Sequence, residues 1–178
     1  MDVAILSDMH VPGQAAGLLE AFREHVAEAE YVVHAGDFGS VDAFADVEAL
    51  ASDLTAVYGN ADPGTIDLPA VASAAIDGTT FVVSHGMINV VERAVSSSEG
   101  VVFDRADWLD AVADTARARA EKPVVGIGGH SHAVEDTTHE GVRILNPGSA
   151  TGVGPADGPT MMTVDVAESN LEVTVREA

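Results

Sequence analysis

Five short polar clusters in this chain of 178 residues each follow a run of apolar residues that is typical of a buried β-strand. The clusters are Asp8-Met9-His10, Gly36-Asp37, Gly59-Asn60, His85-Gly86 and Gly129-His130-Ser131-His132. Because a loop at the end of a strand holds its side chains rigidly, we expect a fold that directs these loops at one point. Imidazole, carboxylate and amide oxygen together suit divalent first-row metals. The pattern therefore predicts a metal site where the loops meet.

The amino-terminal third of the chain alternates between strand and helix patterns. We expect strands at residues 3–7, 31–35 and 54–58, with amphipathic helices at residues 16–30 and 40–50. Ser40 is the residue type that caps the start of a helix. Alternation of this kind is typical of parallel βαβ units.

The rest of the chain is richer in strands. We expect hairpins of residues 72–76 with 79–84, 133–138 with 142–145, and 161–166 with 171–175. A helix is predicted at residues 104–120 and a strand at 124–127. Residues 86–103 are predicted as mostly loop with a short helix near 90–95, residues 146–149 as a tight turn, and 151–159 as a loop. About ten strands with three or four helices indicate two packed sheets with helices outside.

The composition excludes several kinds of site. The chain contains no cysteine, which excludes disulfides, thiolate metal sites and a cysteine nucleophile. We see no linker, and the length is typical of a single domain over residues 1–178. No apolar run reaches the roughly 18 residues of a membrane span, and the amino terminus lacks the pattern of a secretory signal. We therefore expect a cytoplasmic protein without membrane contact.

The charge balance is strongly acidic. There are 29 acidic against 8 basic residues, for a formal net charge of -21, yet 47% of the chain is hydrophobic. The acids lie on helices, as in the i, i+4 row of Glu20, Glu24 and Glu28, where like charges repel one another and concentrated salt screens the repulsion. We therefore favour a halophilic protein over a merely acidic mesophilic one. The charge also argues against binding a nucleic-acid polymer, which needs basic patches.

Each cluster alone is a common turn sequence, but their order is specific. Together they resemble the signature of the calcineurin-like metallophosphoesterases, in particular the compact phosphodiesterases of bacteria and archaea. Gly59-Asn60-Ala61-Asp62 and Asn146-Pro147-Gly148-Ser149 favour that branch. The resemblance covers residues 3 to about 150. It implies an α/β (α+β) fold, a four-layer αββα sandwich of two mixed β-sheets flanked by helices.

The resemblance also implies a site with two divalent metal ions. By matching position, the first ion takes Asp8, His10 and His132, the second takes Asn60, His85 and His130, and Asp37 bridges both. Asp37, Asn60 and His85 are the expected catalytic residues. Manganese is favoured, with nickel, iron, zinc and cobalt as alternatives. The implied reaction is hydrolysis of a small phosphate ester through attack by a hydroxide that bridges the metals.

One departure from the family pattern and several alternatives remain open. Ala61 replaces a histidine thought to assist the leaving group; Asp62 and His34 are candidates by proximity, although we favour structural roles for both. Few basic residues lie near the motifs, which favours a phosphodiester over a phosphomonoester. A non-catalytic scaffold of the same fold, as in a retromer subunit of the superfamily, is a further alternative. The sequence is also compatible with a homo-oligomer. His25 and His139 are expected to be solvated, and residues 146–149 either support the histidine loop or form a plain turn.

Overall fold

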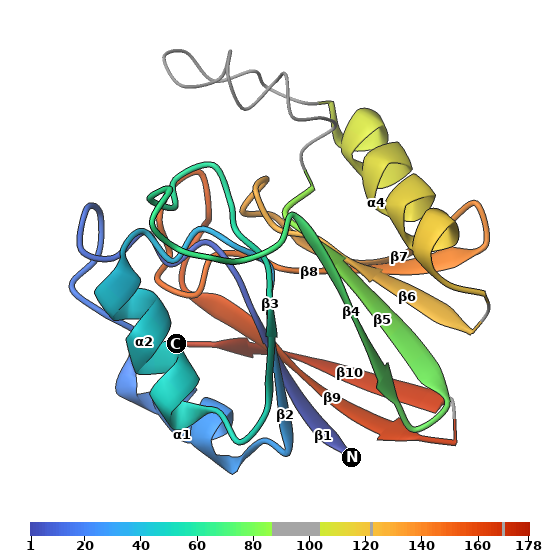
Figure 1. Cartoon of the computed structure of the whole chain (residues 1–178), viewed down its shortest axis with the longest axis horizontal. Coiled ribbons are helices and arrows are strands. Elements are labelled where there is room, and N and C mark those ends of the chain that lie inside the picture. The colour runs from blue at the N-terminus through green and yellow to red at the C-terminus, as the bar shows by residue number, and fades with distance from the viewer. Residues whose placement is uncertain (87–103, 122, 169) are drawn as a thin grey trace.

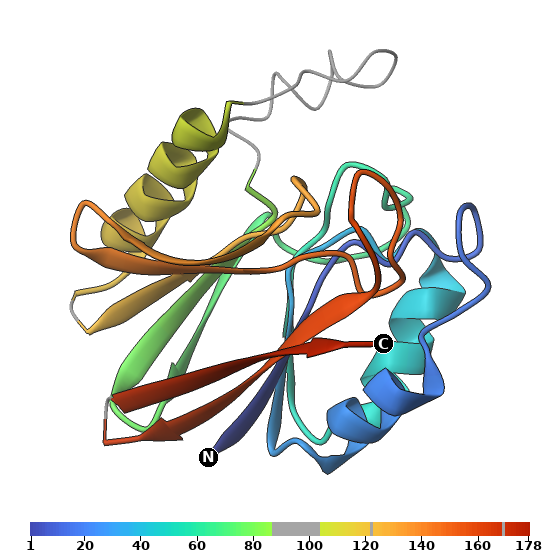
Figure 2. The ribbon, with the colours of Figure 1, turned by 180° about the vertical axis from the view of Figure 1, so that it is seen from behind.

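The computed structural model describes residues 1–86, 104–121, 123–168 and 170–178. Two five-stranded sheets pack face to face, and among the described residues two helices cover the outer face of one sheet while one helix covers that of the other (Figure 1). The view from behind shows the same layers in reverse (Figure 2). The predicted four-layer αββα sandwich is therefore confirmed. Residues 87–103, for which loop and a short helix were predicted, lie outside the described residues.

The first sheet has the strand order β10-β9-β1-β2-β3. Its strands are β1 (Asp2–Leu6), β2 (Tyr31–His34), β3 (Leu54–Ala56), β9 (Thr160–Ala167) and β10 (Asn170–Glu177). The strands β1, β2 and β3 are parallel, while β9 runs antiparallel to β1 and to β10. The predicted βαβ units and the carboxyl-terminal hairpin are both present.

The second sheet has the order β4-β5-β6-β8-β7. Its strands are β4 (Val71–Ile76), β5 (Thr79–Ser84), β6 (Val124–Ile127), β7 (Val134–His139) and β8 (Val142–Pro147). The central strands β5, β6 and β8 are parallel, and each edge strand is the antiparallel arm of a predicted hairpin. In the hairpin of β4 and β5, Asp77 and Gly78 both have positive φ, as a type I′ turn requires.

Three helices lie in the described part of the chain: α1 (Glu20–Glu28), α2 (Val41–Leu50) and α4 (Arg105–Arg119). The predicted cap is confirmed, since the Ser40 side chain accepts a hydrogen bond from the Ala43 N–H. The predicted start of α1 at residue 16 is wrong. Gly17 disfavours helix, and the N-cap Leu19 has no side-chain oxygen to stabilise the first turn. None of the described helices is both long and apolar enough to span a membrane.

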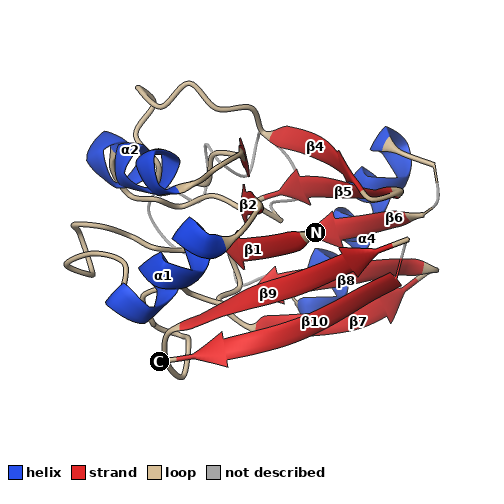
Figure 3. Ribbon diagram, turned by 90° about the horizontal axis from the view of Figure 1, so that it is seen from below, coloured by secondary structure: helices blue, strands red, loops and turns tan. Residues whose placement is uncertain are grey.

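Burial on both faces holds the central strands rigidly. In β1, Ile5 packs into the core between the sheets, while its neighbour Leu6 packs under α1 and α2. On the far side, Trp108 of α4 packs on the second sheet. Seen from below, α1 and α2 lie on one flank of the two packed sheets and α4 lies on the other (Figure 3).

Parallel pairing determines where the polar clusters emerge. Because β1, β2 and β3 are parallel, their carboxyl ends open at one edge of the first sheet. The carboxyl ends of β5 and β6 open together in the second sheet. Figure 1 shows both sets of ends at the same rim of the sandwich. The five motif loops therefore start from rigid strands on one side of the molecule.

Candidate metal centre

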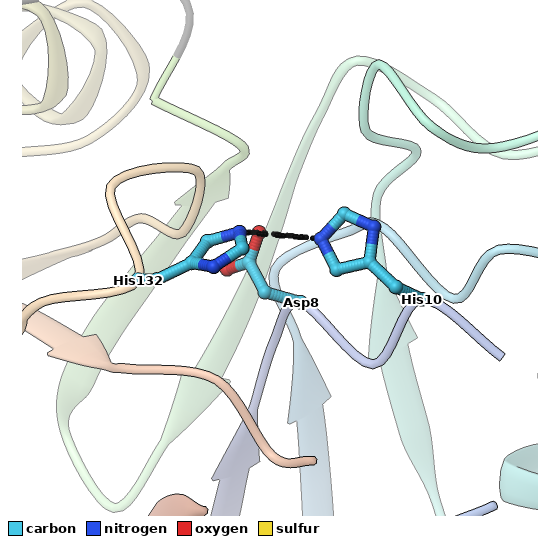
Figure 4. A group of neighbouring side chains, drawn as sticks. All are labelled: Asp8, His10 and His132. Atoms are coloured by element: carbon cyan, nitrogen blue, oxygen red, sulfur yellow. Dashed lines mark hydrogen bonds and ion pairs between the residues drawn. The ribbon is translucent and has the colours of Figure 1, made fainter. Parts of the chain in front are cut away.

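The first group of candidate ligands comes from the loops after β1 and β6. The Nε2 atoms of His10 and His132 lie 3.2 Å apart. Asp8 Oδ1 lies 3.2 Å from His132 Nε2 and 3.9 Å from His10 Nε2. Figure 4 shows the two rings directed toward each other beside the carboxylate. Residues 122 positions apart in the chain thus present three ligand atoms to one point.

The second group comes from the loops after β3, β5 and β6. His85 Nε2 lies 3.2 Å from Asn60 Oδ1, and His130 Nδ1 lies 2.9 Å from the same oxygen. Asp37 Oδ2 lies 3.2 Å from His85 Nε2 and 3.6 Å from His10 Nε2. Asp37 therefore stands between the two groups, and the structure brings all seven sequence-predicted residues together.

The ligand loops use an uncommon backbone conformation. Five of the seven candidate ligands have positive φ: Asp8 at 53°, His10 at 51°, Asp37 at 60°, His130 at 70° and His132 at 56°. Such a conformation costs about 1–3 kcal/mol for a residue with a side chain. The concentration of these residues at one rim indicates that the fold stabilises a strained constellation for a functional reason.

Glycine allows two of the loops to approach each other closely. Gly36 has a φ of 96°, and a Cβ there would lie 2.7 Å from the Gly59 nitrogen and 2.8 Å from His85 Nδ1. Real side chains do not tolerate these distances. Gly36 therefore lets the Gly-Asp loop, the Gly-Asn loop and the His85 ring share one small space.

Backbone carbonyls fix the protonation of two histidine rings. His85 Nδ1 lies 2.7 Å from the Ala35 carbonyl oxygen, and His132 Nδ1 lies 2.8 Å from the Val153 carbonyl oxygen. Because a carbonyl oxygen only accepts, each Nδ1 must carry the proton. The Nε2 atoms are thereby left to face the site, which is the usual orientation of a metal-binding histidine.

Backbone N–H groups orient the two buried carboxylates. Asp8 is 0% exposed, and its two oxygens accept from the His130 N–H at 3.2 Å and 3.0 Å. Asp37 is 1% exposed, and its Oδ1 accepts from the Ala61 N–H at 2.7 Å. Asn60 is exposed. The carboxylates thus form the floor of the site and the amide lies at its open side.

The electrostatics of the site act in opposite directions on its histidines, raising the pKa of His85 and His132 and lowering that of His130. Burial alone would lower the pKa of His85, but the carboxylates of Asp37 and Asp8 raise it to about 10. Burial would raise the pKa of Asp37, yet attraction to His85 brings that pKa below its usual value. Burial would lower the pKa of His132, but its hydrogen bond to Asp8 raises it. Burial lowers the pKa of His130, and repulsion from His85 lowers it further, to about 4.

The donor set fits divalent cations. With the proton of His85 and His132 fixed on Nδ1, each neutral ring turns an Nε2 lone pair toward carboxylate oxygen or another ring nitrogen. Lone pairs that face one another at 3.2 Å repel unless a proton or cation lies among them. Imidazole, carboxylate and amide oxygen suit manganese, iron, cobalt, nickel or zinc. The residues present could therefore hold such ions.

The two candidates for leaving-group assistance have structural positions. The Asp62 carboxylate accepts hydrogen bonds from the N–H groups of Asp37, Gly39 and Gly59 at 2.8–2.9 Å. Those bonds tie the Gly-Asp loop to the Gly-Asn loop. His34 is fully buried, and its ring stacks on Phe38 with centroids 3.6 Å apart. The structural roles favoured from the sequence agree with both environments.

Residues 146–149 support the ligand loops. Asn146 Nδ2 donates to Ser131 Oγ at 2.9 Å, within the histidine loop. Ser149 Oγ donates to the Asp8 carbonyl oxygen at 2.7 Å. The predicted tight turn is wrong in its position, because Asn146 and Pro147 continue β8. Of the two interpretations left open, support for the histidine loop is the one these contacts favour.

The sequence did not reveal the remaining supports. Trp108 Nε1 donates to the Gly129 carbonyl oxygen at 3.0 Å, so helix α4 also holds the histidine loop. The carbonyls of Ala35 and Val153 that orient His85 and His132 were equally unpredicted. No sequence signal could identify them, because every residue carries a carbonyl.

A separate cluster of possible ligands, called the surface cluster below, lies away from the rim. Asp110, His139 and Glu140 place ligand atoms within 4.8 Å of one another. His139 was predicted as a solvated turn residue. The structure corrects this, because His139 is the last residue of β7 and its Nε2 lies 2.6 Å from Asp110 Oδ1. His25, also predicted to be solvated, is half-buried on α1.

Comparison with known proteins defines the class. Residues 1–169 match the calcineurin-like phosphoesterase superfamily domain. A probable metallophosphoesterase of Methanothermobacter thermautotrophicus is 27% identical over 176 residues, covering 98% of this chain and 91% of that protein. The chain therefore belongs to the calcineurin-like phosphoesterase superfamily, and the resemblance inferred from the motifs is confirmed.

Solved structures share the fold. The crystal structure of Vps29 from Entamoeba histolytica in complex with Zn²⁺ has a TM-score of 0.73 and 22% identity, covering 100% of this chain and 98% of that chain. A structure described as a novel archaeal phosphodiesterase has a TM-score of 0.63 and 24% identity, covering 99% and 100%. These similarities extend over the whole length of both relatives and concern the architecture.

Proposed function

We propose that this chain is a metal-dependent phosphodiesterase with two divalent ions at the rim. The observation that carries the proposal is Asp37 Oδ2, which lies 3.2 Å from His85 Nε2 and 3.6 Å from His10 Nε2. That oxygen is placed to serve two ligand groups at once. Family membership supports phosphoesterase activity and divalent metal ions.

In this proposal the ligands divide as their positions in the structure suggest. Asp8, His10 and His132 would hold one ion and Asn60, His85 and His130 the other, with Asp37 available to both. Two such cations supply a hydroxide nucleophile near neutral pH and neutralise charge that develops on the phosphoryl oxygens. Manganese is the proposed metal, with nickel, iron, zinc or cobalt as alternatives.

The protein itself contributes orientation and local charge. The Ala35 and Val153 carbonyls hold His85 and His132 with Nε2 facing the site. The Ala61 N–H fixes the Asp37 carboxylate at 2.7 Å. Asn60, at the open side, is placed to meet a substrate phosphate. Water attack breaks one P–O ester bond and releases an alcohol and a phosphomonoester, without a covalent enzyme intermediate.

A diester is proposed over a monoester because of charge. A diester carries one negative charge, whereas a monoester carries up to two. Among the described residues, the ion pairs of Asp8 and Asp37 are with histidines rather than with arginine or lysine, and the chain has a formal net charge of -21. A small substrate is proposed because such a surface repels a nucleic-acid polymer.

The proposal is tested by hydrolysis of bis-nitrophenyl phosphate with and without Mn²⁺ in KCl, beside nitrophenyl phosphate as the monoester. We expect Mn²⁺-dependent turnover of the diester and slower turnover of the monoester. Faster turnover of the monoester supports the phosphomonoesterase alternative. A stable, fully folded protein that binds no metal and hydrolyses neither ester supports the scaffold alternative.

We also propose that the protein is halophilic and folds as one domain over residues 1–178. The acidic side chains of α1, Glu20, Glu24 and Glu28, are exposed, and Glu20 pairs with Arg23 at 3.8 Å. A melting temperature that rises with KCl supports the halophilic proposal, since salt screens repulsion between like charges. A melting temperature independent of KCl contradicts it.

A further inference from the structure

A cleft adjoins the candidate metal centre. It has a volume of about 570 Å³ and lies between the histidine loop, the loop of residues 151–159 and the end of β10. The His132 ring belongs to both places, since its Nε2 faces Asp8 at 3.2 Å while the residue also lines the cleft. A volume of this size suits a small organic group.

The wall of the cleft is tied to the metal ligands. Val153, in the loop of residues 151–159, accepts the Nδ1–H of His132 at 2.8 Å and donates its N–H to Ser149 Oγ at 3.0 Å. Ser149 in turn donates to the Asp8 carbonyl oxygen. The loop that shapes the cleft therefore has a fixed position relative to the ions.

The lining of the cleft is acidic or neutral. Asp157 and Glu177, both exposed, are the acidic residues of the lining, and the other described lining residues, apart from His132, are uncharged. Arg105 and Arg143, which flank the same sheet, pair with Glu135 and Asp136. The described lining residues therefore include no arginine or lysine, so an anionic group there would face two acidic residues with His132 as the only titratable base among those residues.

The lining also lacks a platform for a nucleobase. Besides the His132 ring, the described lining residues contain no aromatic side chain. Stacking on aromatic rings supplies much of the affinity for flexible nucleotides. The small side chains Ala133, Val134, Pro155 and Ala156 instead offer a compact apolar surface. Carboxylates beside apolar surface are suited to an alkylammonium group.

We propose that this cleft binds a compact cationic alcohol group of the substrate, so that the preferred diester is zwitterionic. The inference rests on the proposed phosphodiesterase function and specifies its substrate class. The ions bind the phosphate, and the cleft beyond His132 receives the ammonium-bearing ester group. Each hydrolysis breaks one P–O bond, and the water oxygen joins phosphorus.

The test uses three diesters with the same nitrophenol leaving group. Their second alcohols are choline, its uncharged carbon isostere 3,3-dimethylbutanol, and thymidine through its 5′ oxygen. Assays use Mn²⁺-loaded protein at the lowest KCl concentration that keeps it folded. We expect kcat/KM for the choline ester to exceed that for the isostere by about fivefold, the size of one close charge pair in water. The thymidine ester should be the poorest substrate.

Two sets of variants locate the effect. The double variant Asp157→Asn, Glu177→Gln should bring the choline-to-isostere ratio close to one while leaving kcat/KM for the isostere unchanged. Asp46→Asn removes an exposed acid of α2 outside the cleft, and it should leave the ratio as in the wild type. A wild-type ratio of one overturns the inference, as does an equal loss of the ratio in Asp46→Asn.

A binding measurement separates this inference from the proposed function. Choline and 3,3-dimethylbutanol are titrated into Zn²⁺-loaded protein, and amide shifts at Ala133 and Gly158 are followed by NMR. Tighter binding of choline, lost in the double variant, supports the cleft even if no diester is hydrolysed. Equal binding of both alcohols contradicts it even if bis-nitrophenyl phosphate is a substrate.

Discussion

Within the described part of the chain, two places bring groups of histidine and carboxylate atoms within 4.8 Å of one another. At the rim, Asp8, Asp37 and His85 are all buried. On the surface, Asp110 and Glu140 are exposed, with His139 half-buried between them. The residue types are the same in both places, so neither composition nor distance distinguishes a metal centre from a chance cluster.

The two clusters differ in the burial of their side chains and in how the protein orients them. On the surface, Asp110 pairs with His139 Nε2 at 2.6 Å and Glu140 pairs with Arg117 at 2.7 Å. Glu140 thus already has a guanidinium partner, and both carboxylates are exposed to water. At the rim, the Ala35 carbonyl holds His85 with Nε2 facing Asp37. A metal centre therefore requires ligands that the fold buries and orients toward one another.

The largest effect should come from the carboxylate between the two ligand groups. Asp37→Ala is expected to lower kcat on bis-nitrophenyl phosphate by roughly a thousandfold or more, because both ions lose a ligand. Asp110→Ala, in the surface cluster, should retain wild-type kcat. Circular dichroism should show that both variants stay folded. An active Asp37→Ala variant would remove the basis for a shared carboxylate.

The sequence predicted the fold to within a few residues because hydrophobic periodicity determines the elements. The strand at residues 124–127 and the hairpin around Asp77 and Gly78 follow the pattern directly. The start of α1 was missed, since an amphipathic pattern continued over Gly17 into residues that are not helical. The hydrophobic pattern of the sequence shows which residues face the core, but the capping residue and glycine decide where a helix begins.

The convergence of the polar clusters could be predicted because each follows a strand and parallel strands end at one edge, and the resemblance to the family then implied which residues are ligands. The orientation of those ligands could not be predicted. The backbone N–H of His130 that holds Asp8, and the carbonyl of Val153 that holds His132, are carried by peptide groups. Their roles arise only when distant loops meet in three dimensions.

A smaller effect is expected from the hydroxyl that links Asp8 to the loop of Val153. Ser149→Ala removes the bond to the Asp8 carbonyl oxygen at 2.7 Å and an acceptor for the Val153 N–H. We expect the affinity for Mn²⁺ to fall about 10- to 100-fold, measured by calorimetry. Ser73→Ala, on an exposed position of β4, is the matched control. Equal affinities in the two variants would show that the hydroxyl does not orient the site.

The rim should also respond to pH in a defined direction. In protein stripped of metal, Asp37 raises the pKa of His85 to about 10. The ion pair therefore stabilises the fold fully below the ordinary histidine pKa of about 6.5 and is lost as pH rises through 10. Metal binding must displace the Nε2 proton, so Mn²⁺ affinity should rise about tenfold per pH unit in this range.

Calorimetry in buffers of different ionisation enthalpy measures the released protons. We expect at least one proton per chain at neutral pH, and the melting temperature of stripped protein should fall as pH rises toward 10. Metal binding without proton release would contradict the assignment of His85 as a ligand. His139→Gln, in the surface cluster, should leave proton release unchanged.

The smallest effect is expected on the surface. Asp110→Asn breaks the pair with His139, whose side chain is 28% exposed. Exposed pairs contribute about 1 kcal/mol or less, so the free energy of unfolding should change by no more than that. Denaturant melts of Asp110→Asn and the wild type give the difference. A loss of several kcal/mol would mean that the surface cluster is more than an ordinary ion pair.

Anomalous X-ray scattering from crystals soaked with Mn²⁺ tests the central claim most directly. The account predicts two peaks at the rim, one beside Asp8, His10 and His132 and one beside Asn60, His85 and His130, with Asp37 between them. No peak at the rim, or a peak only beside Asp110, His139 and Glu140, would contradict it.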